Sequence, residues 1–208
     1  MKQLLIAIAS TIILLLSPLF TPVASAIPLT STSIFTAGDS QVTLDEVALS
    51  DAEPVTTQFA PYGVTFSSGL RSGTVFTDPA NFSGQFLASA GATEPYSIFF
   101  VSDVDAAGAY WEFDAPRSTT IAAYLNGNLV ESYVHENLDC CTTTAFLGFQ
   151  GIVFDEIRVS DLVEGTSLIL DNIHFSDAAV AAVPEPFSLA LLGIGIAGLL
   201  GARRRQPA

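Results

Sequence analysis

Basic residues are scarce in this chain of 208 residues, which has seven Lys and Arg against 21 Asp and Glu. Four of the seven lie at the two ends of the chain, as Lys2 and Arg203 to Arg205. Residues 27–182 keep three Arg and no Lys against 20 acidic residues, a formal charge of −17. A surface with so few cations cannot neutralise phosphates, which excludes nucleic acid as a partner. Divalent cations, cationic surfaces and neutral sugars remain open, as does a role for the acids in solubility alone.

Cysteine is almost absent, and the two that occur, Cys140 and Cys141, are adjacent. Consecutive Cα atoms lie about 3.8 Å apart, which is closer than in an ordinary disulfide. Three states therefore stay open: shielded or modified thiols, a strained disulfide between the two, or a disulfide between chains. His135 is near, but no closed four-ligand zinc pattern surrounds the pair.

Nucleophilic catalysis also lacks its usual residues. The only histidines are His135 and His174, both in predicted strands, and no Gly-x-Ser-x-Gly turn occurs in residues 27–182. Pairs of acids such as Asp45-Glu46 arise by chance in so acidic a chain. The sequence predicts no catalytic residue and a protein that is not an enzyme.

Residues 27–182 show no sustained 3.6-residue apolar period, whereas short runs rich in Val, Ile, Thr, Phe and Tyr alternate with turn residues. Asn126-Gly127 suits a type I′ hairpin turn, and a bulge at Asp155-Glu156 would let both Phe154 and Ile157 face the core. This pattern predicts an all-β fold, an antiparallel β-sandwich of jelly-roll type. We expect a lead-in at 27–40, the sandwich domain at 41–176 and a linker at 177–182. The predicted strands are Gln41–Leu44, Gly63–Ser67, Thr74–Phe76, Gln85–Ser89, Tyr96–Val101, Gly108–Phe113, Thr119–Leu125, Leu129–His135, Thr144–Phe149, Ile152–Val159 and Ser167–Phe175.

The N-terminal segment has the order of a secretory signal peptide. Lys2 precedes the apolar run Leu4–Leu16, and Ala24-Ser25-Ala26 offers the small residues that a signal peptidase reads. We expect residues 1–26 to be removed by signal peptidase. An uncleaved anchor helix is the weaker alternative, because the apolar run is short for a membrane span.

The C-terminal segment is apolar from Phe187 to Ala202 and then carries Arg203, Arg204 and Arg205. As a helix the run would reach roughly 24 Å, close to the hydrocarbon core of a bilayer. The triple Arg follows the positive-inside rule for a cytoplasmic end. We expect a single transmembrane helix here rather than a buried core helix.

Val183-Pro184-Glu185-Pro186, the Gly-rich apolar run and the terminal Arg cluster together resemble the PEP-CTERM sorting signal of bacterial envelope proteins. The resemblance covers about residues 183–205, within a tail at 183–208, and implies recognition by an exosortase. It implies a protein held in the inner membrane, facing the periplasm, and after processing a place in the cell envelope or outside the cell. It implies nothing about the activity of residues 27–182.

Calcium is the one metal that the acidic sequence favours, although no cofactor is firmly indicated. Ser102-Asp103-Val104-Asp105 places two carboxylates, Asp103 and Asp105, two residues apart in a predicted loop, where both can point to one side. Asp139 and Asp171 are further candidates. The competing interpretation is a solvated acidic loop.

Sugar binding would use exposed aromatic faces. The candidates are Tyr62, Tyr96, Tyr110 and Tyr133, whereas Trp111, the only tryptophan, is expected in the core. The leading hypothesis is a non-catalytic envelope or matrix protein that binds extracellular polysaccharide or another surface component. A secreted glycan hydrolase and a purely structural surface protein are the alternatives.

Overall fold

The computed structural model describes residues 26–73, 82–89, 95–113, 117–137, 144–162 and 167–178. The predicted signal peptide up to residue 25, Cys140 and Cys141, and the whole sorting tail lie outside the described residues, as do Asp139 and the predicted strand at 74–76. In the ranges given, no helix has both the length and the apolar character needed to cross a membrane.

The described residues form antiparallel strands and one turn of 3-10 helix, which confirms the all-β class. The finer assignment to the jelly-roll type stays a prediction. The elements are β1 (Ile27–Leu29), β2 (Ser40–Val42), η2 (Ala60–Tyr62), β3 (Val64–Phe66), β4 (Leu70–Gly73), β5 (Phe86–Ser89), β6 (Tyr96–Phe113), β7 (Arg117–Leu125), β8 (Asn128–Asn137), β9 (Ala145–Ser160) and β10 (Leu168–Asp177).

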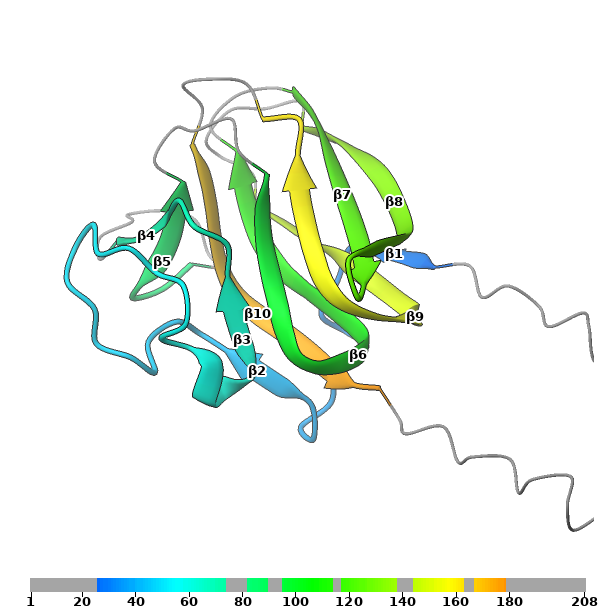
Figure 1. The fold of residues 1–208 in the computed structure, drawn as a ribbon, viewed down its shortest axis with the longest axis horizontal. Helices are drawn as coiled ribbons and strands as arrows, with labels where there is room; N and C mark the ends of the chain where they lie inside the picture. The colour runs from blue at the N-terminus through cyan, green and yellow to red at the C-terminus, as the bar shows by residue number, and fades with distance from the viewer. Residues whose placement is uncertain are drawn as a thin grey trace, which may run out of the picture.

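The strands hydrogen-bond in the order β4-β5-β10-β6-β9-β7-β8, with β1 on β9, β2 on β10 and β3 on β6. The sheet folds back on itself because β6 and β9 are long and bent, and each contributes to both layers of the sandwich (Figure 1). The first half of β6 pairs with β3 and the second half of β9, and that half of β9 also pairs with β7. The second half of β6 pairs with β10 and the first half of β9.

The bend lies where the regular register of β6 and β9 is interrupted. Phe99 pairs with Glu156 and Ala106 with Gln150, with register shifts in between. Gly151 adopts a positive φ of 79° at the same level of β9. Phe154 and Ile157 are both fully buried, as the sequence predicts for an irregularity at this point.

The core between the two layers is made of large side chains from both. Trp111 is fully buried, and its indole N–H donates to the carbonyl of Leu147 at 3.3 Å, so the expected core position is confirmed. Tyr133 of β8 lies edge-on to Phe149 of β9 with the ring centroids 5.2 Å apart, although these parts of the two strands are not paired. Such contacts between facing sheets fix the spacing of the sandwich.

Asn126 and Gly127 join β7 to β8 with positive φ angles of 51° and 75°, as the predicted type I′ turn requires. The carboxylate of Asp155 accepts the N–H of Asn126 at 2.9 Å. The hairpin is therefore tied to the bend of β9.

The outer edge of β8 is the end of the strand order among the described residues. Leu129, Val130 and Val134 are exposed there. The N–H of Ser132 donates to the carboxylate of Glu131 at 3.0 Å, so this N–H is not part of the ladder with β7. This edge therefore exposes apolar side chains, and one of its backbone N–H groups is already hydrogen-bonded to a carboxylate.

Several predicted boundaries are wrong in an informative way. The expected lead-in contains β1, which pairs with β9, and β4 was not predicted at all. The two strands predicted at Tyr96–Val101 and Gly108–Phe113 are one strand, β6. Likewise, Thr144–Phe149 and Ile152–Val159 belong to one strand, β9. The small and polar residues between each pair of predicted strands are typical of loops, but in the structure each of these segments is a bent part of one continuous strand.

A buried carboxyl group holds the segment before β5 against β10. Asp171 is fully buried and accepts the N–H groups of Asn172 at 2.7 Å and Ser83 at 3.2 Å. Burial raises the pKa of Asp171 to about 7, and the carboxylates of Asp45 and Glu46 act in the same direction, while the two N–H groups oppose it. This carboxyl group therefore stays protonated in the folded protein up to about pH 7, well above the range of an ordinary aspartate.

We expect Gly148→Ala to destabilise the protein by at least about 3 kcal/mol. A Cβ at Gly148 would overlap the carbonyl oxygen of Ala107 and the Cα of Gly108, and both are backbone atoms that cannot rotate away. Urea unfolding followed by circular dichroism measures the change. Gly38→Ala is the control, because its Cβ would meet only the Thr36 hydroxyl at 3.9 Å. Equal unfolding midpoints for the two variants would contradict the tight β6–β9 contact.

The buried Asp171 predicts a pH dependence of stability. Its pKa is about 7 when folded and near 3.8 when unfolded, so the folded state binds more protons between these values. The contribution of this group to the free energy of unfolding is complete below about pH 4 and is lost as the pH rises through about 7, by up to about 4 kcal/mol. We expect Asp171→Asn to remove this fall and to melt higher than the natural protein at pH 8.

Thermal melting across pH 4 to 8 measures this difference, with the exposed Asp51→Asn as the control. The same slope of melting temperature against pH in Asp171→Asn and in the natural protein would show that Asp171 does not titrate in this range.

Candidate functional site

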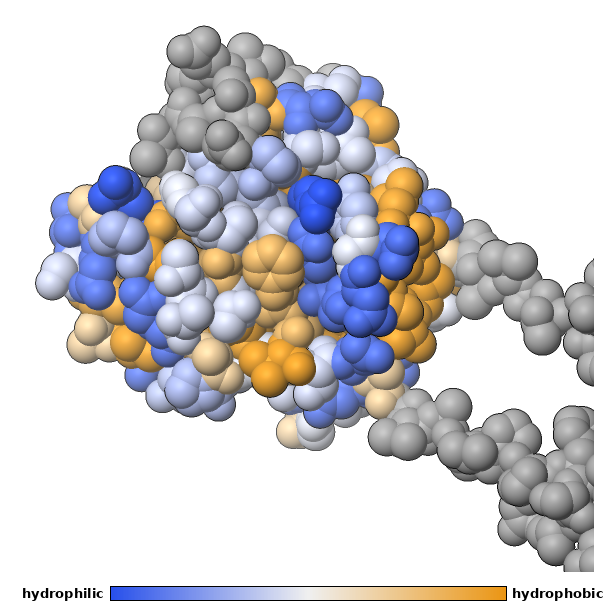
Figure 2. All heavy atoms as spheres, viewed as in Figure 1, coloured by the Kyte–Doolittle hydropathy of each residue, from blue (hydrophilic) through white to orange (hydrophobic). Residues whose placement is uncertain are grey.

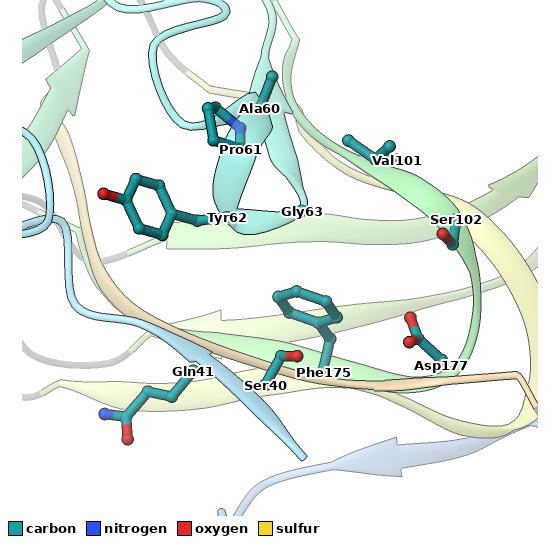
Figure 3. Close-up of a pocket in the computed structure, with 10 residues that line it drawn as sticks. All are labelled: Ser40, Gln41, Ala60, Pro61, Tyr62, Gly63, Val101, Ser102, Phe175 and Asp177. Atoms are coloured by element: carbon teal, nitrogen blue, oxygen red, sulfur yellow. The ribbon is translucent and has the colours of Figure 1, made fainter. Parts of the chain in front are cut away.

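An open groove of about 500 Å³ lies between η2, the bend of β6 and the paired strands β2 and β10 (Figure 3). Its lining combines one exposed aromatic ring with hydroxyl, amide and carboxylate groups. The lining residues are Ser40, Gln41, Ala60, Pro61, Tyr62, Gly63, Val101, Ser102, Phe175 and Asp177.

Tyr62 stands at the edge of this groove with 43% of its surface exposed. Its hydroxyl donates to the carbonyl of Glu46 at 3.2 Å, and its ring lies 6.4 Å from that of Phe59, which is fully buried. The polar tip and one side of the ring are thus fixed by the protein. The remaining ring surface is open to a ligand.

Gly63 explains how η2 comes so close to the sheet. It ends η2 with a φ of 95°, a conformation that favours glycine, and its N–H donates to the carbonyl of Ala60 at 3.1 Å. A Cβ at Gly63 would lie 2.8 Å from the ring of Phe175, which points toward this turn in Figure 3. The N–H of Val101 donates to the carbonyl of Gly63 at 2.9 Å and fastens the turn to β6.

The opposite side of the groove is polar and comes from two paired strands. Ser40 pairs with Phe175, and Asp177 at the end of β10 pairs with Val104. Ser40, Gln41, Ser102 and Asp177 are all exposed. Because Phe175 is only 4% exposed, it forms an apolar floor under these groups.

The charge in and beside the groove is negative. Asp177 is the only acid among the described residues of the lining, and they include no Lys or Arg. Asp39 precedes Ser40, and the backbone N–H of Thr36 together with the hydroxyls of Ser176 and Thr36 lowers the pKa of its carboxyl group. The groove therefore suits neutral or cationic ligands better than anions.

Of the aromatic residues considered for sugar binding, the structure places only Tyr62 in the groove. Tyr96 is fully buried, while Tyr110 and Tyr133 pack edge-on against Phe146 and Phe149. One signal for the site was missed in the sequence, the turn Ala60-Pro61-Tyr62-Gly63, in which Pro and Gly bracket an aromatic residue that cannot enter a strand.

The predicted calcium ligands Asp103 and Asp105 lie within β6, not in a loop. Val104 between them is fully buried, so both carboxylates point away from the core, Asp103 exposed and Asp105 half-buried. No group of three or more His, Cys, Asp or Glu that could hold a metal ion occurs in the described part of the chain. A calcium role for Asp103 and Asp105 stays a proposal.

Both histidines pack against aromatic rings. His135 lies 6.1 Å from Phe113, and His174 lies 5.4 Å from Phe35 and 5.8 Å from Phe146 between ring centroids. Burial lowers the pKa of each imidazole, so both favour the neutral form. Their surroundings are those of structural side chains in a sandwich.

The solved structures similar to this chain include carbohydrate-binding proteins. A mutant of the family 29 carbohydrate-binding module CBM29-2 has a TM-score of 0.34 and 13% identity, covering 59% of this chain and 99% of that one. The K2 cleaved adhesin domain of Lys-gingipain has a TM-score of 0.38 and 9% identity, covering 73% and 99%. Carbohydrate-binding module CBM36 in complex with calcium and xylotriose has a TM-score of 0.27 and 15% identity, covering 62% and 100%.

No curated protein matches the chain. The family model of the PEP-CTERM protein-sorting motif matches residues 182–205 and confirms the resemblance seen in the sequence. The motif implies export and a membrane-anchored precursor that an exosortase processes. This chain is therefore one that carries a PEP-CTERM protein-sorting motif at its C-terminal end.

Proposed function

We propose that this chain is an exported, non-catalytic surface protein whose β-sandwich binds polysaccharide in the groove beside Tyr62. The single observation that carries the proposal is the exposed Tyr62 ring at the edge of an open, polar groove. Sugars present both an apolar C–H face and hydroxyl groups. An aromatic ring at the edge of a groove lined by hydrogen-bonding groups matches these two features.

The hydrogen-bonding groups of the groove serve this ligand in both directions. The hydroxyls of Ser40 and Ser102 donate and accept, the amide of Gln41 does the same, and the carboxylate of Asp177 accepts. No cation among the described lining residues would attract a phosphate or a carboxylate, and the −17 charge of residues 27–182 repels polyanions. The groove therefore favours neutral or amine-bearing glycans.

Binding fits the groove better than hydrolysis does. Glycoside hydrolysis generally needs two carboxyl groups facing each other across the scissile bond. The described lining offers one, Asp177. The groove can hold a glycan without the second group that would cleave it.

The ends of the sandwich support the proposed route to the cell surface. β1 starts at Ile27, directly after the predicted signal peptidase site, and β10 ends at Asp177, shortly before Val183. Figure 1 shows these two ends on the same side of the molecule. The nine residues between Asp177 and the start of the apolar run at Phe187 reach at most about 32 Å, so before processing the domain would stay near the inner membrane, on its periplasmic side. Processing would then place it in the envelope or outside the cell.

We expect Tyr62→Ala to weaken binding of neutral polysaccharides by about tenfold or more, because it removes the aromatic face. Tyr62→Phe is the matched control, since it keeps the ring and loses only the hydrogen bond to Glu46. Affinity electrophoresis of the exported chain in gels containing single soluble polysaccharides measures the retardation. Equal retardation of the Ala and Phe variants would place the binding site elsewhere, and retardation of neither the variants nor the natural protein by any glycan would refute the proposal.

Calcium binding at Asp103 and Asp105 belongs to the proposal as a stabilising contact. Both carboxylates point outward from one strand, and an ion between them would relieve their repulsion. Calcium at about a hundred times Kd would add roughly 2.7 kcal/mol to the free energy of unfolding. We expect melting to rise in calcium more than in magnesium or in NaCl of equal ionic strength, and Asp103→Asn to lose the rise. Equal melting in all three salts would leave these acids as solvated surface groups.

A further inference from the structure

The outer face of β6 continues beyond the groove with a second exposed aromatic ring. Phe99 and Val101 are 37% and 63% exposed, whereas Ile98 and Phe100 between and beside them are buried. Residues two apart on a strand lie on the same face, about 7 Å from each other. Because Val101 lines the groove, Phe99 lies one strand repeat outside it. Figure 2 shows apolar side chains exposed in the middle of the face that carries β3 and β6.

A rigid polar group lies beside this ring. Glu156 of β9 is directly opposite Phe99, and Arg158 is opposite Ser97. The Glu156 carboxylate accepts the Ser97 hydroxyl at 2.6 Å and the Arg158 Nε and Nη2 at 2.8 and 3.1 Å. The guanidinium also stacks on Tyr124, with its central carbon 3.9 Å from the ring centroid. Bidentate pairing and stacking together fix the plane of a long side chain that would otherwise be mobile.

The arrangement resembles the groove in its chemistry. The side chain of Arg158 is 33% exposed, so it can donate to a ligand, while Glu156 at 4% exposure offsets its charge. A neutralised guanidinium favours hydroxyl groups over phosphates or carboxylates. An apolar ring next to such a donor is again suited to a sugar ring.

We propose that Phe99 and Arg158 form a second sugar subsite, called the platform below. One linear neutral polysaccharide would then occupy the groove and the platform at the same time. The inference rests on the proposed function of the groove. It adds that the ligand is longer than one sugar unit, since a single chain has to reach both the groove and the second subsite.

The alternative is a purely structural role for Phe99, in which its ring only covers the buried Glu156 carboxylate. Phe99→Leu keeps an apolar cover of similar reach and lacks the flat aromatic face, whereas Phe99→Trp keeps and enlarges that face. The two variants therefore separate stacking from covering.

The test is isothermal titration of the exported chain with neutral oligosaccharides of increasing length, built from glucose, xylose, mannose or N-acetylglucosamine. For the natural protein, we expect the affinity to rise with length until both subsites are filled. Phe99→Leu should bind short oligosaccharides normally and long ones about tenfold more weakly, the loss typical of one interface anchor. Phe99→Trp should retain the rise. Val134→Ala, a change at an exposed apolar residue of β8, is the control and should bind as the natural protein does.

The outcomes separate this inference from the proposed function. If Phe99→Leu binds long oligosaccharides as tightly as the natural protein while Tyr62→Ala does not, the platform is refuted and the groove stands. If the affinity of the natural protein does not increase with length, the two-subsite arrangement is wrong. If no oligosaccharide binds at any length, both the groove and the platform are refuted.

Discussion

The pairing of two long strands, β6 and β9, is the constraint on which the rest of this structure depends. Both strands run through both layers, so their contact holds the two halves of the sandwich together as one sheet. The contact is very close at Gly148, where a Cβ would overlap the backbone of Ala107 and Gly108, and at Gly108, where it would meet the Phe146 ring and the Leu147 carbonyl. The bend of β6 in turn sets the position of Val101 and Ser102, so the place of the groove follows from the place of the bend.

Local features of the fold could be predicted because their causes are local. Asn126-Gly127 predicts its own turn, since both residues tolerate positive φ, and alternation identifies most strands. The lengths of β6 and β9 could not be predicted, because Ser102 to Ala106 and Gln150-Gly151 have the composition of loops. Only the partner strands on either side keep these segments extended. Strand β1 was missed for a related reason, since three residues acquire their strand conformation from β9 alone.

The sequence indicated which type of residue the candidate site would contain, but not which residues come together to form it. Tyr62 could be singled out as an aromatic residue outside the regular strands, whereas Ser40 and Asp177 meet it only through the pairing of β2 and β10 with distant parts of the chain. Asp171 shows the same limit. The sequence places it in the predicted strand Ser167–Phe175 as a possible calcium ligand, and nothing nearby in the sequence shows that the fold buries it against the segment before β5. Burial and long-range pairing are properties of the whole sandwich, and no short stretch of sequence contains them.

The hydrogen bond between the Glu131 carboxylate and the N–H of Ser132 bears on how copies of this protein interact when many of them lie close together at one surface. An unpaired strand edge with exposed valines is a template on which a second chain can add a strand, and many copies gathered at one surface would make such stacking frequent. An incoming strand would first have to break a charge-assisted hydrogen bond and bring a second strongly acidic domain against the first. The carboxylate of Glu131, near the middle of β8, therefore adds a free-energy cost to the addition of a second strand at this edge.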